Sequence, residues 1–121
     1  MTKVSPSLRL RVVVGPGVML GPGKAELLEM IHETGSIAAA GRRMNMSYKR
    51  AWMLVETMNA TFRAPVVEGS RGGSKGGGAV VTETGIAVLA AYRALERHLV
   101  SAGKAEIDQL TALLGDIPDG K

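Results

Sequence analysis

A glycine-rich segment between two short apolar runs constrains the fold most. Residues 69–77 contain five glycines together with Arg71 and Lys75, and the apolar runs are Val66-Val67 before them and residues 79–81 after them. Two short apolar strands joined by a flexible loop predict a β-hairpin. A phosphate-binding P-loop would instead need Gly-Lys-Ser or Gly-Lys-Thr at the start of a helix, and Ser74-Lys75-Gly76 leads into a strand. The alternative is a hairpin tip with no binding role.

Three amphipathic segments precede this hairpin. Apolar residues recur at helical spacing over residues 24–34, which end at Gly35, a typical C-terminal glycine. Ser36 and Ser47 can cap two further helices, over residues 37–44 and about 48–62. The core stripe of the third helix consists of Ala51, Val55, Met58 and Phe62. Three short helices followed by a glycine-rich hairpin predict a mainly α fold with small β content, a winged helix-turn-helix.

Further elements are expected on both sides of this unit. Residues 8–14 alternate between apolar and basic before becoming wholly apolar, and residues 18–20 follow a Gly-Pro-Gly turn, so we predict a strand and a return strand. A helix beginning at Thr82 or Thr84 has a broader apolar surface than a small core needs. A last helix is expected over residues 104–114.

Basic residues gather in the middle third of the chain. The net charge is +4, and the stretch from Arg42 to Lys75 holds seven basic residues but only two acidic ones. Such an excess attracts polyanions, although a solvated basic surface is the alternative. Lys49 and Arg50 lie in the first turn of the predicted third helix, from which side chains reach base edges. The predicted DNA-binding residues are Ser36, Arg42, Arg43, Ser47, Tyr48, Lys49, Arg50, Arg71, Gly72, Gly73, Ser74 and Lys75.

Trp52 and the methionines of this region have a simpler interpretation. A lone tryptophan beside an aliphatic stripe is more often a core residue than a DNA contact, and we predict the core for Trp52. Core or boundary packing is also predicted for Met44, Met46, Met53 and Met58.

No catalytic residue, metal site or cofactor is predicted. The chain has no cysteine, its two histidines (His32 and His98) lie far apart, and no serine has a base at a recognisable spacing. The short apolar run Val12 to Val14 can be neither a signal peptide nor a membrane span. We therefore expect a cytoplasmic protein that is not an enzyme and has no membrane partner.

Several stretches carry a family resemblance, over about residues 8–100. They are Gly35-Ser36-Ile37, Ser47-Tyr48-Lys49 with Ala51-Trp52, Met58-Asn59, and the wing from Gly72 to Thr82 followed by Gly85. The sequence resembles the N-terminal DNA-binding domain of ModE-type molybdate-responsive regulators, whose winged helix is related to that of LysR-type regulators. The resemblance implies a bacterial regulator that dimerises through the N-terminal strand region and the long helix after the wing.

These observations predict the following organisation. A flexible N-terminus covers residues 1–7, and the winged helix-turn-helix covers residues 8–100, with the wing at 66–82 and a dimerisation helix at 83–100. A short C-terminal helix and tail cover residues 101–121. Members of the family continue into molybdate-binding domains, whereas this sequence stops at Lys121, so we expect no molybdate-sensing domain.

The expected function is sequence-specific binding of double-stranded DNA by a homodimeric transcription regulator linked to molybdenum homeostasis. Three alternatives for the control of this regulator stay open. A separate protein senses the oxyanion, the chain regulates something other than molybdenum homeostasis, or it binds DNA without an effector. The alternative function is a protein-interaction module in which the apolar surface of residues 86–99 joins a partner regulator and DNA contact is secondary.

Overall fold

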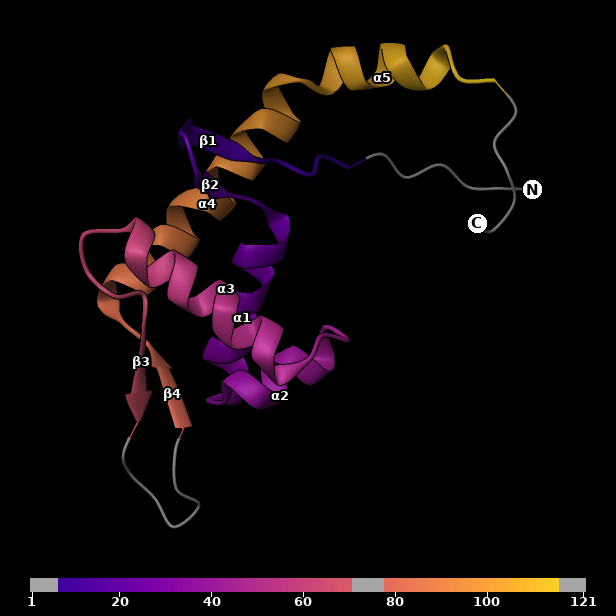
Figure 1. Cartoon of the computed structure of the whole chain (residues 1–121). Helices are drawn as coiled ribbons and strands as arrows, with labels where there is room; N and C mark the ends of the chain where they lie inside the picture. Colours follow the sequence, from indigo (N-terminus) through magenta and orange to yellow (C-terminus); the bar gives the residue numbers. More distant parts are fainter. Residues whose placement is uncertain (1–6, 71–77, 116–121) are drawn as a thin grey trace.

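The computed structural model describes residues 7–70 and 78–115 and contains, within them, helices and two antiparallel hairpins. The elements in chain order are β1 (Val12–Gly15), β2 (Val18–Leu20), α1 (Pro22–Thr34), α2 (Ile37–Arg43), α3 (Tyr48–Thr61), β3 (Val67–Ser70), β4 (Gly78–Val81), α4 (Glu83–Ala102) and α5 (Lys104–Ala112). The β3–β4 hairpin projects from the group formed by α1, α2 and α3, and α4 runs from the base of this hairpin toward β1 and β2 (Figure 1). The fold is a mainly α winged helix-turn-helix with small β content, as predicted.

The hydrophobic core lies between α1, α3 and the base of the β3–β4 hairpin. Leu27, Leu28 and Ile31 project from α1 into this core, and Val55 and Met58 project from α3. All five side chains are buried, because both helices turn their apolar stripe inward. The core stripe predicted for α3 is confirmed, with Phe62 partly buried at its end.

The angle between α2 and α3 depends on small residues and a tight turn. A Cβ on Gly41 would lie only 3.2 Å from the Cβ of Ala51, so the lack of a side chain at Gly41 lets α3 pack closely against α2. Asn45 turns the chain between them with a positive φ of 58°, a conformation that asparagine tolerates better than most residues. The Met46 N–H closes the turn on the Gly41 carbonyl oxygen at 2.9 Å.

Both predicted serine caps are present. The Ala39 N–H donates to Ser36 Oγ at 3.0 Å, and the Arg50 N–H donates to Ser47 Oγ at 3.1 Å. Each hydroxyl oxygen therefore satisfies an amide that the first turn of its helix leaves without a partner. These caps explain why α2 and α3 begin where the sequence indicated.

Two elements begin at least two residues away from their predicted start. α1 begins at Pro22 rather than at Lys24, because proline in the first turn needs no hydrogen-bond donor and its φ suits a helix. β1 begins at Val12 rather than at Leu8, because its partner strand ends where α1 begins. Val12 pairs with Leu20, the last residue of β2.

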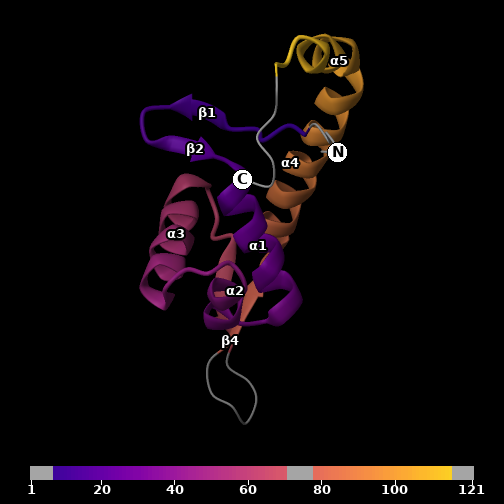
Figure 2. The same ribbon diagram turned by 90° about the vertical axis from the view of Figure 1, so that its right-hand side faces the viewer.

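The long helix α4 is held to α1 and to the chain before β1. The Tyr92 hydroxyl donates to the Leu10 carbonyl oxygen at 2.5 Å, and burial raises the pKa of this phenol above its ordinary value. Arg93 pairs with Glu29 of α1 at 2.5 Å and with Glu96 at 2.9 Å. α5 follows α4 at the end of α4 that lies farthest from the β3–β4 hairpin (Figure 2), and Leu113, just after α5, is 81% exposed.

Candidate nucleic-acid interface

The outer surface of α2 and α3 presents basic side chains to solvent. Arg42, Lys49 and Arg50 are all exposed, and residues 36–61 contain four basic residues against the single acidic Glu56. Among the described residues, neither Lys49 nor Arg50 has a carboxylate within ion-pair distance. Both lie in the first turn of α3. Their charge is therefore available to an external polyanion.

Arg43 points elsewhere. Its guanidinium pairs with Glu33 of α1 at 3.1 Å and also contacts the sulfur of Met30 at 3.9 Å. The pair is exposed to solvent on both sides, so breaking it costs at most about 1 kcal/mol. The DNA contact of Arg43 stays a prediction, and it requires this side chain to leave Glu33.

The wing is described only at its base. Arg71, Gly72, Gly73, Ser74 and Lys75, all predicted to contact DNA, lie outside the described residues. β3 and β4 pair in register from Val67 with Val81 to Ser70 with Gly78.

Asn59 fixes the base of the wing to α3, and sequence reasoning assigned it no role. Its Oδ1 accepts from the N–H groups of Val66 at 2.8 Å and Val67 at 3.2 Å, and its Nδ2 donates to the Val67 carbonyl oxygen at 3.1 Å. One sequence feature could have identified Asn59: it is a polar residue near the end of a predicted helix, seven residues before a predicted strand. These bonds set the direction in which the wing leaves the body.

Thr82 and Gly85 complete this junction. The Thr82 hydroxyl donates to the Pro65 carbonyl oxygen at 2.6 Å and accepts from the Gly85 N–H at 3.0 Å, so Thr82 caps α4. A Cβ on Gly85 would lie 2.6 Å from Cγ1 of Val81 and closer still to the carbonyl oxygen of Val66. Only glycine lets α4 approach the wing this closely.

Trp52 is not a core residue, so its predicted position is wrong. Its side chain is 39% exposed and lies beside Tyr48, which is 56% exposed. Its indole N–H donates to the Tyr48 hydroxyl oxygen, and the rings meet edge to face at 87° with centroids 6.3 Å apart. The ring stays uncovered because its neighbours across a hollow, Ala38 and Ala79, are small.

The methionine predictions have mixed outcomes. Met58 is buried, and Met44 and Met46 pack partly buried against the core. Met53 is exposed on the outer surface of α3, because it lies opposite the core stripe of that helix.

A hollow of about 190 Å³ lies between the start of α2, the first turns of α3 and β4. It is lined by Ser36, Ile37, Ala38, Tyr48, Trp52, Gly78 and Ala79. The lining mixes hydroxyl groups with small apolar surfaces and, among the described residues, contains no charged side chain. We call it the aromatic hollow.

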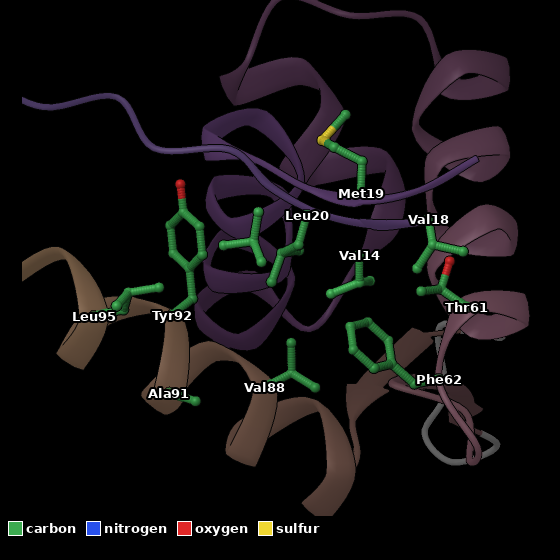
Figure 3. A pocket seen from close by; sticks show the side chains of 11 residues that line it. Val14, Val18, Met19, Leu20, Thr61, Phe62, Val88, Ala91, Tyr92 and Leu95 are labelled. Atoms are coloured by element: carbon green, nitrogen blue, oxygen red, sulfur yellow. The ribbon is translucent and has the colours of Figure 1, made fainter. Parts of the chain in front are cut away.

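A second, apolar groove of about 280 Å³ lies on another side of the molecule. Side chains from β1 and β2, the end of α3, and α4 face one another across it (Figure 3). Val14, at its edge, is 73% exposed, and Leu95 on α4 is also exposed. A contiguous apolar surface of this kind is typical of a protein contact.

Over the described ranges 7–70 and 78–115, no group of three or more potential metal ligands occurs. In the same ranges, no helix has the length and apolar character needed to cross a bilayer.

Comparison with known proteins gives relatives named for molybdenum binding or transport and for transcriptional regulation. The molybdenum transport protein ModE of Azotobacter vinelandii is 35% identical over 120 residues, which cover 99% of this chain and 43% of that protein. The molybdenum-pterin-binding protein MopB of Rhodobacter capsulatus is 48% identical over 80 residues, 66% of this chain and 30% of that protein. The chain is a homologue of ModE-type regulators. No family model matches it.

The ModE of Escherichia coli, described as a DNA-binding transcriptional dual regulator, is 37% identical over 71 residues, 59% of this chain and 27% of that protein. The chain thus spans less than half the length of each of these relatives. The predicted resemblance to ModE-type regulators is confirmed. The expectation that no molybdate-sensing domain accompanies it stays a prediction.

Proposed function

We propose that this chain is a transcription regulator that binds double-stranded DNA through α3 and the wing. One observation carries the proposal: Lys49 and Arg50 are exposed in the first turn of a helix whose angle to α2 is fixed by the contact between Gly41 and Ala51. A helix held in this way by a helix-turn-helix enters the major groove by its N-terminal residues. The name of the Escherichia coli relative, a DNA-binding regulator, supports the same function.

Each basic residue has a distinct role in this proposal. Arg50 and Lys49 read base edges, since either side chain can bond the O6 and N7 atoms of guanine. Arg42 and Arg43 hold phosphates next to α2, and Arg71 and Lys75 hold phosphates along the wing. Phosphate contacts position the protein on the duplex, and base contacts select the sequence.

This proposal is tested by selecting duplexes from a randomised pool and then measuring the affinity for the recovered duplex at several salt concentrations. The affinity should fall steeply with salt, because several phosphate contacts release counterions. Arg50→Ala should cost about 1–3 kcal/mol and relax selectivity at one base position. Lys104→Ala is the matched control, because it removes one exposed positive charge from α5 and should leave binding unchanged. Affinity that ignores salt would refute DNA binding.

The same proposal includes a homodimer. The apolar groove between the β1–β2 hairpin and α4, with the exposed side chains of Val14 and Leu95 at its edge, supports a contact with a second copy. Sedimentation should give a dimer for the wild type and a monomer for Leu95→Glu, because the carboxylate would be buried in an apolar contact. A dimer unaffected by this substitution would place the contact elsewhere.

We further propose that the regulator acts in molybdenum homeostasis, as the names of its relatives suggest, and that it acts in the cytoplasm. Calorimetry of the chain with molybdate and with tungstate tests whether it binds the oxyanion itself. Binding would show that the chain is its own sensor. If neither ion binds, the remaining alternatives are a separate oxyanion-sensing protein, regulation of something else, and DNA binding without an effector.

The second candidate is a protein-interaction module that joins a partner regulator. The exposed leucines of α4 and α5, such as Leu99 and Leu110, favour it. A wild-type chain that sediments as a stable monomer and binds duplexes only weakly would support this candidate over the homodimeric regulator.

A further inference from the structure

We propose that the aromatic hollow seats one backbone phosphate of bound DNA, with Tyr48 as its hydrogen-bond donor and Trp52 as the positioning residue for Tyr48. The inference rests on the proposed DNA binding. It adds one DNA contact, made by the flank of α3, to the DNA contacts proposed for the basic side chains of the same helix.

The hydrogen bond between the two side chains sets the direction of the Tyr48 hydroxyl. An indole N–H can only donate, so the Tyr48 oxygen accepts from Trp52. The single hydroxyl hydrogen of Tyr48 must then point to another acceptor. On an exposed face, the acceptors on offer are water or the oxygens of a ligand. The pair thus presents one oriented donor.

The pair is also ordered before DNA arrives. Tyr48 and Trp52 lie one helical turn apart on α3, and their edge-to-face contact restrains both rings. A tyrosine at the first position of a helix would otherwise sample several rotamers, and binding would have to freeze one of them. Restraint by Trp52 removes part of this entropic cost.

The chemistry of the hollow suits a sugar-phosphate unit. Its small apolar residues, Ala38 and Ala79, can pack against deoxyribose carbons, and Tyr48 supplies a donor for a phosphate oxygen. No carboxylate lines the described part of the hollow, so no negative charge opposes the phosphate. Lys49 and Arg50 lie beside Tyr48 in the chain and raise the local positive potential.

The position of the hollow favours the DNA backbone over a base edge. Tyr48 and Trp52 face the start of α2 and the wing strand β4, whereas Lys49 and Arg50 lie on the outer surface of α3. In a winged helix the recognition helix and the wing contact different parts of the duplex, so a sugar-phosphate strand passes between them. Contacts to that strand position the protein without selecting sequence.

A double-mutant cycle on the whole chain tests the inference. The variants are Trp52→Phe, Tyr48→Phe and the combination of both, and the probes are the duplex recovered from the randomised pool and a scrambled duplex. Tyr48→Phe should bind both duplexes about 10-fold more weakly, as expected for the loss of a hydrogen bond to a charged group. Trp52→Phe should weaken both by a smaller factor, because it removes only the positioning of the Tyr48 hydroxyl. The double variant should bind no more weakly than Tyr48→Phe, because Trp52 acts through that hydroxyl.

Three further measurements separate this role from a merely structural one. The dependence of affinity on salt should stay unchanged in Tyr48→Phe, since a neutral donor releases no counterion, whereas Arg42→Ala, which removes a proposed phosphate contact, should reduce the slope by about one. Replacing single phosphates of the recovered duplex by methylphosphonates should reveal one linkage that weakens the wild type but not Tyr48→Phe. Both aromatic side chains are exposed, so urea unfolding should give near-wild-type midpoints.

Three results would overturn the inference while leaving DNA binding intact. The first is that both single variants bind DNA with wild-type affinity. The second is that Trp52→Phe weakens binding equally in the wild type and in Tyr48→Phe. The third is that binding weakens only on the recovered duplex, which would indicate base reading. A wild-type chain with no salt-dependent affinity for any duplex would instead refute the proposed function itself.

Discussion

Asn59→Ala should destabilise the protein and weaken its binding to DNA, because this side chain joins the wing to α3. The substitution removes three hydrogen bonds, to the N–H groups of Val66 and Val67 and to the Val67 carbonyl oxygen. Each such bond contributes about 0.5–1.5 kcal/mol, and a buried donor left without a partner costs about 1–3 kcal/mol. Val66 is fully buried, so its N–H has no access to water. We expect a loss of about 3 kcal/mol in the free energy of unfolding.

Two companion variants make this prediction specific. Asn59→Asp keeps both acceptor bonds but loses the donor and sets a carboxylate oxygen against the Val67 carbonyl oxygen. It should therefore lose stability, but less than Asn59→Ala, which leaves two N–H groups without their acceptor. Thr57→Ala removes a hydroxyl that donates to the Met53 carbonyl oxygen on the exposed side of α3, and its effect should stay within about 0.5 kcal/mol.

These differences in the free energy of unfolding can be measured by urea unfolding, with the circular dichroism signal of the helices as the probe. The dependence of this free energy on urea concentration should be the same in all variants. DNA binding, measured at a temperature where every variant is folded, should weaken in Asn59→Ala on all sequences alike, since a displaced wing loses phosphate contacts. Equal midpoints for Asn59→Ala and Thr57→Ala would refute the claim that Asn59 carries the junction.

Three other outcomes follow from the structure. Gly85→Ala should cost about 2 kcal/mol of stability by overpacking, whereas Gly23→Ala, whose Cβ would meet nothing within 4 Å, should be neutral or slightly stabilising; equal effects in calorimetry would contradict the close approach of α4. Arg42→Ala should weaken binding to all duplexes alike and lower the salt slope by about one, in contrast to the base-specific loss expected of a base-reading residue. The pKa of Tyr92 is raised in the folded protein, so its contribution to stability is complete below the unfolded pKa of about 10 and is lost as pH rises through the folded pKa. The free energy of unfolding, measured with urea at increasing pH, should therefore fall less steeply above about pH 10 in Tyr92→Phe than in the wild type.

The sequence allowed the element order to be predicted because several helix boundaries depend on local chemistry. Ser36 and Ser47 cap helices whichever tertiary structure follows, and Gly35 ends α1 with a positive φ of 70°. The close packing of α2 and α3 was also foreseeable, since small residues gather in α2. These features need no knowledge of distant neighbours.

The environment of Trp52 could not be predicted in this way. It lies on the flank of the α3 core stripe, where burial depends on what packs across from it. That neighbour is Ala79, from a strand 27 positions later in the chain, and it is too small to cover an indole. Arg43 is a similar case, because its partner Glu33 belongs to α1. Periodicity assigns a face of a helix but not the size or charge of the residue opposite.

The backbone of Val66 is the point at which the described parts of the proposed DNA-binding surface are joined. Its N–H donates to Asn59 of α3, its carbonyl oxygen accepts from the Thr82 N–H at the start of α4, and the absence of a Cβ on Gly85 leaves room for that oxygen. Two of these contacts are hydrogen bonds of the Val66 main chain, so replacing the Val66 side chain removes neither. The direction of the wing is therefore set by Asn59, Thr82 and Gly85, all outside the strands of the wing, and substitutions there should move the wing as one body. Substitutions on the exposed faces of the strands should instead change single contacts and leave its direction intact.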